Sequence, residues 1–194
     1  MKVLGIMGSP RKQSNTDLLL DKALEGAAQA GAETEKVLVS KLKISPCLEI
    51  YACVKDGNCP IKDDMLPLYD KLVEADHVIL ASPIFFYSIT AQAKALVDRS
   101  QALWARKHVL GMGKDDKRER RGAFISVGAT KGEKLFEGAV LTVKYFFDAI
   151  NVKYSGDVLV RGVDDKGQIT EHPSALQHAF RLGQQLVHPD KPDA

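Results

Sequence analysis

The chain has 194 residues, of which 45% are hydrophobic and 27% are charged, and its formal net charge at pH 7 is +2. This composition excludes a disordered or fibrous chain, and the length suits a single globular domain. The net charge is too small to indicate binding to nucleic acid or to a membrane, and three cysteines do not make a secreted disulfide framework. We expect a cytoplasmic protein without a signal peptide or a membrane span.

Five short β-rich runs alternate with longer helical patterns along the chain. The expected strands cover residues 2–7, 34–39, 77–81, 122–127 and 152–160. The expected helices cover residues 16–30, 64–74, 90–104, 135–150 and 174–187. The first, third and fourth strands are apolar nearly throughout, as in parallel strands that are covered on both faces. This alternation predicts an α/β fold with a doubly wound parallel sheet and helices on both of its faces.

We expect these elements to form one domain over residues 1–188, followed by a flexible tail at residues 189–194, where two prolines stand among charged residues. Open parallel sheets bind their ligands at the carboxyl ends of the strands, near the change in strand order. The loops of interest therefore follow residues 7, 81 and 127.

The loop after the first strand concentrates hydroxyl groups, one arginine and the free amides of a helix N-terminus. It reads Gly-Ser-Pro-Arg-Lys-Gln-Ser-Asn-Thr over residues 8–16, and Ser14 and Asp17 are placed as a capping box. Such groups satisfy a phosphate monoester, although a polar connector with an ordinary helix cap has the same composition. The motifs G-x-x-x-x-G-K-[ST] and G-x-G-x-x-G are absent, and Ser82 stands where a receiver domain requires an aspartate. The loop predicts a singly phosphorylated ligand.

Two parts of this loop, Gly8-Ser9-Pro10-Arg11 and Ser14-Asn15-Thr16, closely resemble the phosphate loop of the NAD(P)H-dependent FMN reductase family. The resemblance implies a flavodoxin-like fold that binds FMN, with a five-stranded parallel sheet in the order 2-1-3-4-5. It also implies which side chains surround the FMN phosphate: Ser9, Arg11, Ser14, Asn15 and Thr16.

The loop after the third strand is rich in aromatic residues and reads Ser-Pro-Ile-Phe-Phe-Tyr-Ser-Ile-Thr over residues 82–90. Aromatic side chains are unusual in a plain connector, and a flavin ring requires flat apolar contacts. They could instead pack under the next helix or at a dimer interface. The loop is similar to the Ser-Pro-(Val/Ile)-Tyr/Phe loop of the family, which implies cofactor-binding roles for Pro83, Ile84, Phe85, Phe86, Tyr87 and Ser88.

Small residues follow the fourth strand, where the chain reads Ser-Val-Gly-Ala-Thr-Lys-Gly over residues 126–132. A backbone without bulky side chains can approach a ring closely. In the family this loop borders the polar edge of the flavin, so the resemblance implies a cofactor-binding role for Gly128, but a simple turn would have the same sequence.

Three cysteines, Cys47, Cys53 and Cys59, are separated by five residues each. Residues 57–65 resemble the iron–sulfur flavoprotein branch of the same superfamily, in which four closely spaced cysteines hold a [4Fe–4S] cluster. Ile50 stands where a second ligand would fall. Because a cubane cluster takes four thiolates, we expect no bound cluster unless Glu49 or another chain completes the set. A packed segment without a metal and a redox-active thiol pair are the alternatives.

Residues 106–121 contain seven lysines and arginines and three acidic residues, a local net charge of +4. The segment predicts either a solvated loop or a docking patch for the 2′-phosphate of NADPH or for an acidic redox partner. No aromatic residue lies inside this charged run, which disfavours nucleic acid. None of the five histidines has metal-ligand spacing with the cysteines.

Together these features predict an FMN-dependent NAD(P)H oxidoreductase that passes hydride from NAD(P)H to bound flavin and on to a small-molecule acceptor such as free flavin, a quinone or a metal ion. We assign no catalytic residue, because hydride transfer requires no protein acid or base. The resemblance implies a homodimer or homotetramer. The alternatives are a non-catalytic flavin electron carrier, which the sequence pI of about 8.3 disfavours because such carriers are acidic, and an iron–sulfur flavoprotein relay.

Overall fold

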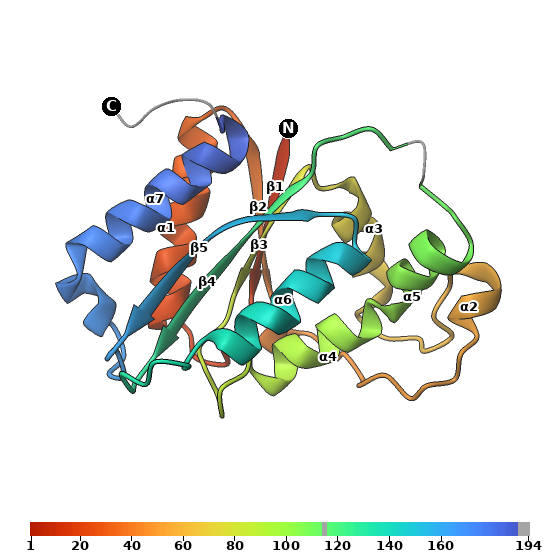
Figure 1. The fold of residues 1–194 in the computed structure, drawn as a ribbon, viewed down its shortest axis with the longest axis horizontal. Helices are drawn as coiled ribbons and strands as arrows, with labels where there is room; N and C mark the ends of the chain where they lie inside the picture. The colour runs from red at the N-terminus through yellow and green to blue at the C-terminus, as the bar shows by residue number, and fades with distance from the viewer. Residues whose placement is uncertain (114–115, 190–194) are drawn as a thin grey trace.

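The sheet of this protein has five parallel strands in the order β2-β1-β3-β4-β5 (Figure 1). The computed structural model describes residues 1–113 and 116–189. The strands are β1 (Lys2–Met7), β2 (Glu33–Leu38), β3 (His77–Ala81), β4 (Arg121–Gly128) and β5 (Lys153–Arg161). The predicted fold class and strand order are confirmed, and each strand begins and ends within one residue of its expected position.

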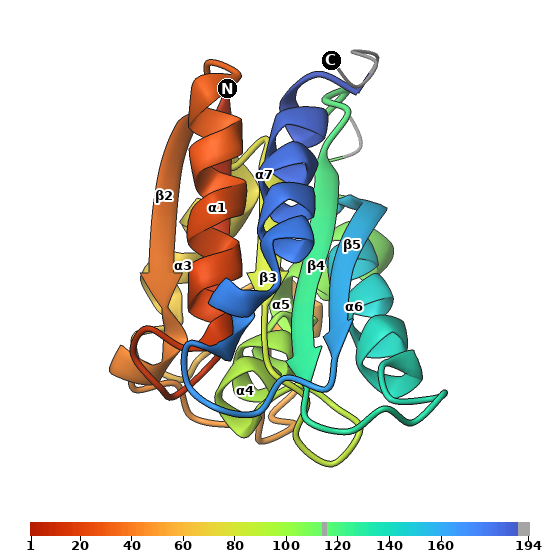
Figure 2. The ribbon, with the colours of Figure 1, turned by 90° about the vertical axis from the view of Figure 1, so that its left-hand side faces the viewer.

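Two helices cover one face of the sheet, and the others cover the opposite face. Figure 2 shows α1 (Asn15–Gln29) and α7 (Pro173–Val187) side by side on the first face. Their backbones approach closely through two glycines: a Cβ added at Gly26 would lie 1.9 Å from the carbonyl oxygen of Phe180, and one added at Gly183 would lie 1.8 Å from that of Ala23. The opposite face carries α3 (Leu66–Glu74), α4 (Ala91–Arg99), α5 (Gln101–Trp104) and α6 (Glu137–Ala149).

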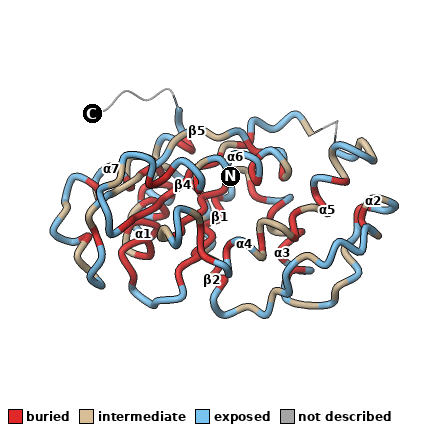
Figure 3. The backbone as a smooth tube through the Cα atoms, turned by 60° about the horizontal axis from the view of Figure 1, so that its bottom comes forward, coloured by how far each residue is buried: buried red, intermediate tan, exposed pale blue. Residues whose placement is uncertain are grey.

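The two helical layers give the sheet an apolar core on each side. Leu19, Leu20 and Ala179 belong to the core under α1 and α7, whereas Leu96 and Phe146 belong to the core under the other layer. Figure 3 shows the buried backbone concentrated in the sheet and in the helix faces that contact it. Strands covered in this way are buried on both faces, as β3 is throughout, and apart from His77 its residues are apolar.

The single helix expected over residues 90–104 is broken at Ser100. The Ser100 hydroxyl donates to the carbonyl of Leu96 at 3.0 Å, a bond that bends helices. The chain continues as α5 and then as a π-helical turn, Ala105–Val109. Three further short elements are α2 (Cys53–Asp56) and the 3₁₀ turns Val39–Lys41 and Gln168–Glu171. Elements of three or four residues have too little periodicity to be predicted from sequence.

The described part of the chain contains no helix that is both long and apolar enough to cross a membrane. Within the predicted tail, residues 190–194 lie outside the described residues. The assignment of residues 1–188 to one domain stays a prediction.

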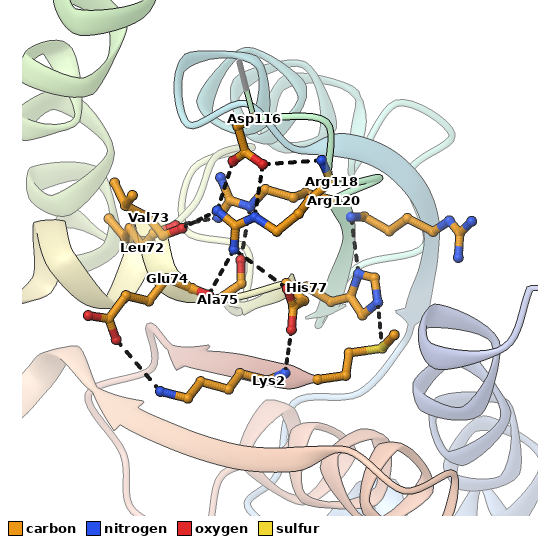
Figure 4. A network of polar contacts seen from close by, with 12 residues as sticks. Lys2, Leu72, Val73, Glu74, Ala75, His77, Asp116, Arg118 and Arg120 are labelled. Atoms are coloured by element: carbon orange, nitrogen blue, oxygen red, sulfur yellow. Dashed lines mark hydrogen bonds and ion pairs between the residues drawn. The ribbon is translucent and has the colours of Figure 1, made fainter. Parts of the chain in front are cut away.

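A buried arginine organises the edge of the sheet at which the strands begin (Figure 4). Arg120 directly precedes β4 and is 5% exposed. Its guanidinium donates to the carbonyls of Ala75 at 2.9 Å and Ile150 at 2.6 Å, and also to that of Leu72. These carbonyls belong to the C-terminal ends of α3 and α6, which a cation stabilises. Burial, followed by the charge of Arg118, lowers the pKa of Arg120 to about 10.

Candidate functional site

The loops after β1, β3 and β4 meet at the opposite edge of the sheet, where the strands end. The amide of Gly8 donates to the carbonyl of Ala81 at 2.7 Å. The amide of Ser82 donates to Ile125, at 3.0 Å, so the loop after β3 is bonded on both sides. This is the edge at which a doubly wound sheet binds its ligands.

Three buried hydroxyl groups fix these loops relative to one another. Thr90, the N-cap of α4, donates from Oγ1 to the carbonyl of Gly8 at 2.6 Å. Ser82 Oγ accepts the amide hydrogen of Thr90 at 3.0 Å, and Ser126 Oγ donates to the carbonyl of Ser82 at 2.7 Å. Such fully satisfied buried networks hold a backbone in one arrangement. The sequence does not predict this network, because its members are far apart in the chain. Only Ser82 and Thr90 are fewer than 36 residues apart.

The loop after β1 has the form of a phosphate cradle. Ser14 is the N-cap of α1, and its Oγ accepts the amide hydrogen of Asp17 at 3.3 Å and lies 3.1 Å from Thr16 Oγ1. Ser9 Oγ accepts the amide hydrogen of Arg11 at 3.2 Å, and the Arg11 side chain is exposed. The first amides of a helix have no acceptor within the helix. Ser14 takes up that of Asp17, which leaves those of Asn15 and Thr16 to bind an anion. These residues fit a phosphate monoester.

Asp17 fixes the backbone of the cradle through its carboxylate. Its Oδ2 accepts the amide hydrogen of Gln13 at 2.9 Å, where the backbone has a φ of 50°. Its Oδ1 pairs with Lys36 Nζ at 2.7 Å, and Lys36 also pairs with Asp21 at 2.6 Å. Burial alone lowers the pKa of Lys36, but the bonds to the two carboxylates outweigh it and the pKa is raised. The expected capping box is only half formed, because the carboxylate binds Gln13 rather than the amide of Ser14.

The Asn15 side chain lies on the far side of the cradle, bonded inside the protein. Its Nδ2 donates to the carbonyl of Asp165 at 2.9 Å, and its Oδ1 accepts the amide hydrogen of Ile169 at 3.1 Å. These bonds tie the loop after β5 to the start of α1. At the cradle, Asn15 therefore offers its backbone amide rather than its side chain.

The aromatic loop after β3 ends in a tight, strained turn. Phe85 and Ser88 exchange backbone hydrogen bonds of 2.9 and 3.0 Å, and the two residues between them have φ values of 48° and 62°. Such angles favour asparagine and glycine, yet Phe86 and Tyr87 occupy them, and Phe86 is fully exposed. Strain of this kind is retained where function requires it. Within the described chain, Phe86 does not pack under the next helix.

The remaining predicted residues lie around this turn. Pro83, Ile84 and Ser88 are half-buried. Gly128 ends β4, where an added Cβ would lie 2.6 Å from Leu135 and would displace that side chain. The carbonyl of Tyr87 would lie 2.8 Å from a Cβ added at Gly138, which places the turn against the start of α6.

The cysteine segment lies beside α4 and α5. Cys53 is buried in α2, and Cys47 and Cys53 line a cavity of about 340 Å³ together with Asp98. Burial, followed by the charge of Cys59, raises the pKa of the Cys53 thiol. Among the described residues, no three cysteine, histidine or acidic side chains are placed to hold a metal ion. Three thiols are one short of the four that a cubane cluster takes, and the expectation that none is bound stays a prediction.

Arg99 anchors this segment to α4. On α4, Lys94 and Asp98 stand four residues apart and form an ion pair of 2.7 Å. Arg99, however, is fully buried and binds Asp63 at 2.7 Å and the carbonyl of Ser45 at 3.0 Å. Desolvation alone would raise the pKa of Asp63, but its bonds, first to Arg99, lower it. A side chain that pairs across 36 residues gives no local sequence pattern.

A comparison with protein families identifies the family of this chain. Residues 1–153 match the family model of NADPH-dependent FMN reductase. The chain belongs to this family. Proteins that resemble it include an iron–sulfur flavoprotein of Methanosarcina thermophila, which is 34% identical over 174 residues, 90% of this chain and 84% of that protein.

An iron–sulfur flavoprotein of Methanocaldococcus jannaschii is 39% identical over 131 residues, which are 68% of this chain. The match covers 64% of that relative, slightly less than two thirds of its length. Among solved structures, an NAD(P)H:quinone oxidoreductase from Methanothermobacter marburgensis superimposes with a TM-score of 0.75 at 17% identity, over 100% of this chain and 99% of that one. This likeness shows the fold alone.

The family match confirms the predicted resemblance to the NAD(P)H-dependent FMN reductase family. The roles of the individual site residues stay predictions.

Proposed function

We propose that this protein is an FMN-dependent NAD(P)H oxidoreductase that passes electrons to a small-molecule acceptor, namely free flavin, a quinone or a metal ion. One observation carries the proposal: in a chain of the FMN reductase family, the phosphate cradle and the strained aromatic turn lie on neighbouring loops of the same sheet edge. A ligand with a phosphate at one end and a flat ring at the other matches both.

The cradle would bind the phosphate through neutral donors and one cation. The hydroxyls of Ser9, Ser14 and Thr16 and the first amides of α1 donate hydrogen bonds. Arg11, which is exposed at the rim, adds a charge-assisted bond. The amide of Asn15 belongs to the same set, while its side chain holds the loop.

The aromatic turn would orient the ring. Phe85, Phe86 and Tyr87 offer flat surfaces, and the backbone of the two neighbouring loops, including Gly128, offers donors and acceptors for a polar ring edge. FMN, when bound, supplies the hydride chemistry. The protein residues bind and orient, so we name no general acid or base.

We further propose a homodimer or homotetramer, with the exposed aromatic turn near the interface. A cytoplasmic location, and the absence of nucleic-acid and membrane partners, complete the proposal.

The test begins with the absorbance spectrum of freshly purified protein, followed by NADH and NADPH oxidation with a quinone or ferricyanide as acceptor. We expect the spectrum of oxidised flavin, about one FMN per chain, and steady-state turnover. A colourless protein that binds no FMN added in excess would overturn the proposal. Bound flavin with a negligible rate of NADH and NADPH oxidation would favour the electron carrier.

A second candidate, an iron–sulfur flavoprotein relay, is favoured by the names of the relatives and by the three thiols in one segment. It predicts iron and acid-labile sulfide near one cluster per chain, and a broad brown shoulder in the spectrum. Protein prepared without oxygen that contains neither would remove this candidate.

A further inference from the structure

A cavity of about 570 Å³ lies under the connector that leads from α5 to β4. Its apolar lining comes from four elements and includes Val73, Leu103, Met112 and Ile150. This volume lies within the range of sites for small organic molecules, which are mostly apolar with a few polar groups. The body of a molecule with two or three rings would fit inside.

A second cavity, of about 290 Å³, adjoins the first, because both are lined by Lys107, Arg120 and Asn151. The second cavity is predominantly basic: its other lining residues include Arg118, Arg121 and Lys153. A largely apolar space therefore lies next to a positively charged one.

The charges around the two cavities are unequally paired. The lining cations are Arg106, Lys107, Arg118, Arg120, Arg121 and Lys153, and the lining acids are Asp56, Asp116, Glu119 and Asp148. Within residues 1–113 and 116–189, three of these cations have no carboxylate at ion-pair distance, namely Arg106, Arg120 and Lys153. Of the acids, only Asp56 has no cation at ion-pair distance within the same residues. This excess of unpaired positive charge favours an anionic ligand.

Arg120 lies at the boundary of the two cavities and retains hydrogen-bond capacity. A guanidinium has five N–H groups, and Nε, Nη1 and Nη2 each donate one hydrogen bond to a carbonyl. Two N–H groups therefore remain. Figure 4 shows this side chain beside Arg118, which is itself neutralised by Asp116 at 2.8 Å.

These cavities are separate from the proposed flavin site. Arg121, which lines the second cavity, begins β4, and Gly128, at the aromatic turn's edge of the sheet, ends it. A strand rises about 3.3 Å per residue, so roughly 20 Å separate the two places.

We propose that the adjoining cavities form a second ligand site for an amphipathic organic anion. The flat apolar body of the ligand occupies the larger cavity, and its anionic group lies between Lys107 and Arg120, towards Lys153. This site goes beyond the proposed oxidoreductase function and does not depend on it.

The probe is 8-anilinonaphthalene-1-sulfonate, an aromatic anion, measured by equilibrium dialysis against the protein with its FMN bound. N-phenyl-1-naphthylamine, which has the same rings without the sulfonate, is the matched neutral probe. We expect one equivalent of the anion to bind, at least tenfold more tightly than the neutral probe, with FMN retained. Release of one FMN per probe would place the probe in the flavin site and overturn the proposal. So would binding of several equivalents without saturation, or no binding.

Two variants locate the bound probe. Ala149→Phe fills the larger cavity and should weaken the anion at least tenfold, while Lys153→Gln removes one unpaired cation and should weaken it about threefold. Lys166→Gln, an exposed lysine in the loop after β5, is the control and should change nothing. FMN affinity and Tm report whether each variant is folded, and Lys153→Gln decides the question if Ala149→Phe does not fold. Anion binding that is unchanged in both cavity variants contradicts the site.

Discussion

The two edges of the sheet hold their loops in opposite ways. At the edge where the strands begin, one buried cation, Arg120, donates hydrogen bonds to carbonyls at the ends of two helices. At the edge where the strands end, neutral hydroxyls fix the loops, and the amides at the start of α1 are available to a ligand. Phe86 and Tyr87 are exposed there and have positive φ angles. Backbone groups are satisfied internally at the first edge and left available at the second. The comparison shows that a buried charged side chain closes one end of the sheet, whereas the other end presents backbone amides and exposed aromatic groups.

The largest expected effect follows from breaking the first edge. Arg120→Met leaves the buried carbonyls of Leu72, Ala75 and Ile150 without donors, and each unsatisfied group costs about 1–3 kcal/mol. We expect the free energy of unfolding to fall by about 3–5 kcal/mol in urea denaturation. FMN affinity of the folded fraction should not change.

The neighbouring residue provides the control for this comparison. The Arg121 side chain pairs with the exposed Glu119 at 2.7 Å, so Arg121→Met should change stability by about 0.5 kcal/mol or less. If both variants lost the same small amount of stability, Arg120 would not be the element that holds this edge.

At the binding edge, Asp17 should position the cradle rather than stabilise the fold at large. Asp17→Ala removes the acceptor for Gln13 and one partner of Lys36, while the rest of α1 remains. We expect FMN to bind about tenfold more weakly, a loss of about 1.4 kcal/mol. Riboflavin, which lacks the phosphate, should bind as it does to the wild type. Fluorescence titrations with both flavins measure this preference.

Asp21→Ala is the matched control, because Asp21 also pairs with Lys36 but does not contact the cradle. Its FMN affinity should stay within about twofold of the wild type, since an exposed ion pair contributes little. Equal weakening of FMN and riboflavin by Asp17→Ala would indicate general unfolding and contradict a positioning role.

The strained turn predicts a gain in stability with a loss of binding. Replacing Phe86 by Asn and Tyr87 by Gly supplies the residues that such a turn favours, and Phe86 buries no surface that would be lost. We expect the double variant to be more stable by roughly 1 kcal/mol and to bind both FMN and riboflavin more weakly, because the flat surfaces are gone. Unchanged flavin affinity would show that the turn serves another purpose, such as an interface.

Sequence patterns were sufficient for the fold, and the fold class then supplied a predicted position for the site. Apolar runs of five to six residues predicted β1, β3 and β4. The loops after these three strands were singled out because the fold class places ligands there. The helix break at Ser100 was missed, since a helix-compatible sequence continues through it.

The interactions that the sequence did not reveal join residues far apart in the chain. Arg99 reaches Asp63, and Asn15 reaches Ile169 across 154 residues. Arg120 was counted as part of a basic run that predicts a solvated loop or a docking patch, although it is one of the most buried charges in the described chain. Nothing local distinguishes a buried arginine from an exposed one, because only the tertiary fold supplies its partners.

The smallest expected effect concerns pH and returns to the first edge. His77 is buried in β3, its Nδ1 accepts the amide hydrogen of Arg121 at 3.2 Å, and burial followed by the charge of Arg121 lowers its pKa below the ordinary value of 6.5. Above pH 6.5 the imidazole is neutral in both the folded and the unfolded protein, so it makes no pH-dependent difference. As the pH falls below 6.5, the unfolded chain takes up the proton first, and stability declines until the folded pKa is reached.

His77→Gln should therefore lose the part of the stability decline below pH 6.5 that this imidazole causes, as measured by urea denaturation at a series of pH values. His178→Gln, a change at an exposed position on α7, should keep the slope of the wild type. The difference in slope between the two variants isolates His77 from every carboxylate that titrates in the same range. Equal slopes would mean that this edge tolerates a charged His77 beside Arg121, in addition to the buried Arg120. Burial of charge would then not be what distinguishes this edge from the one where the strands end.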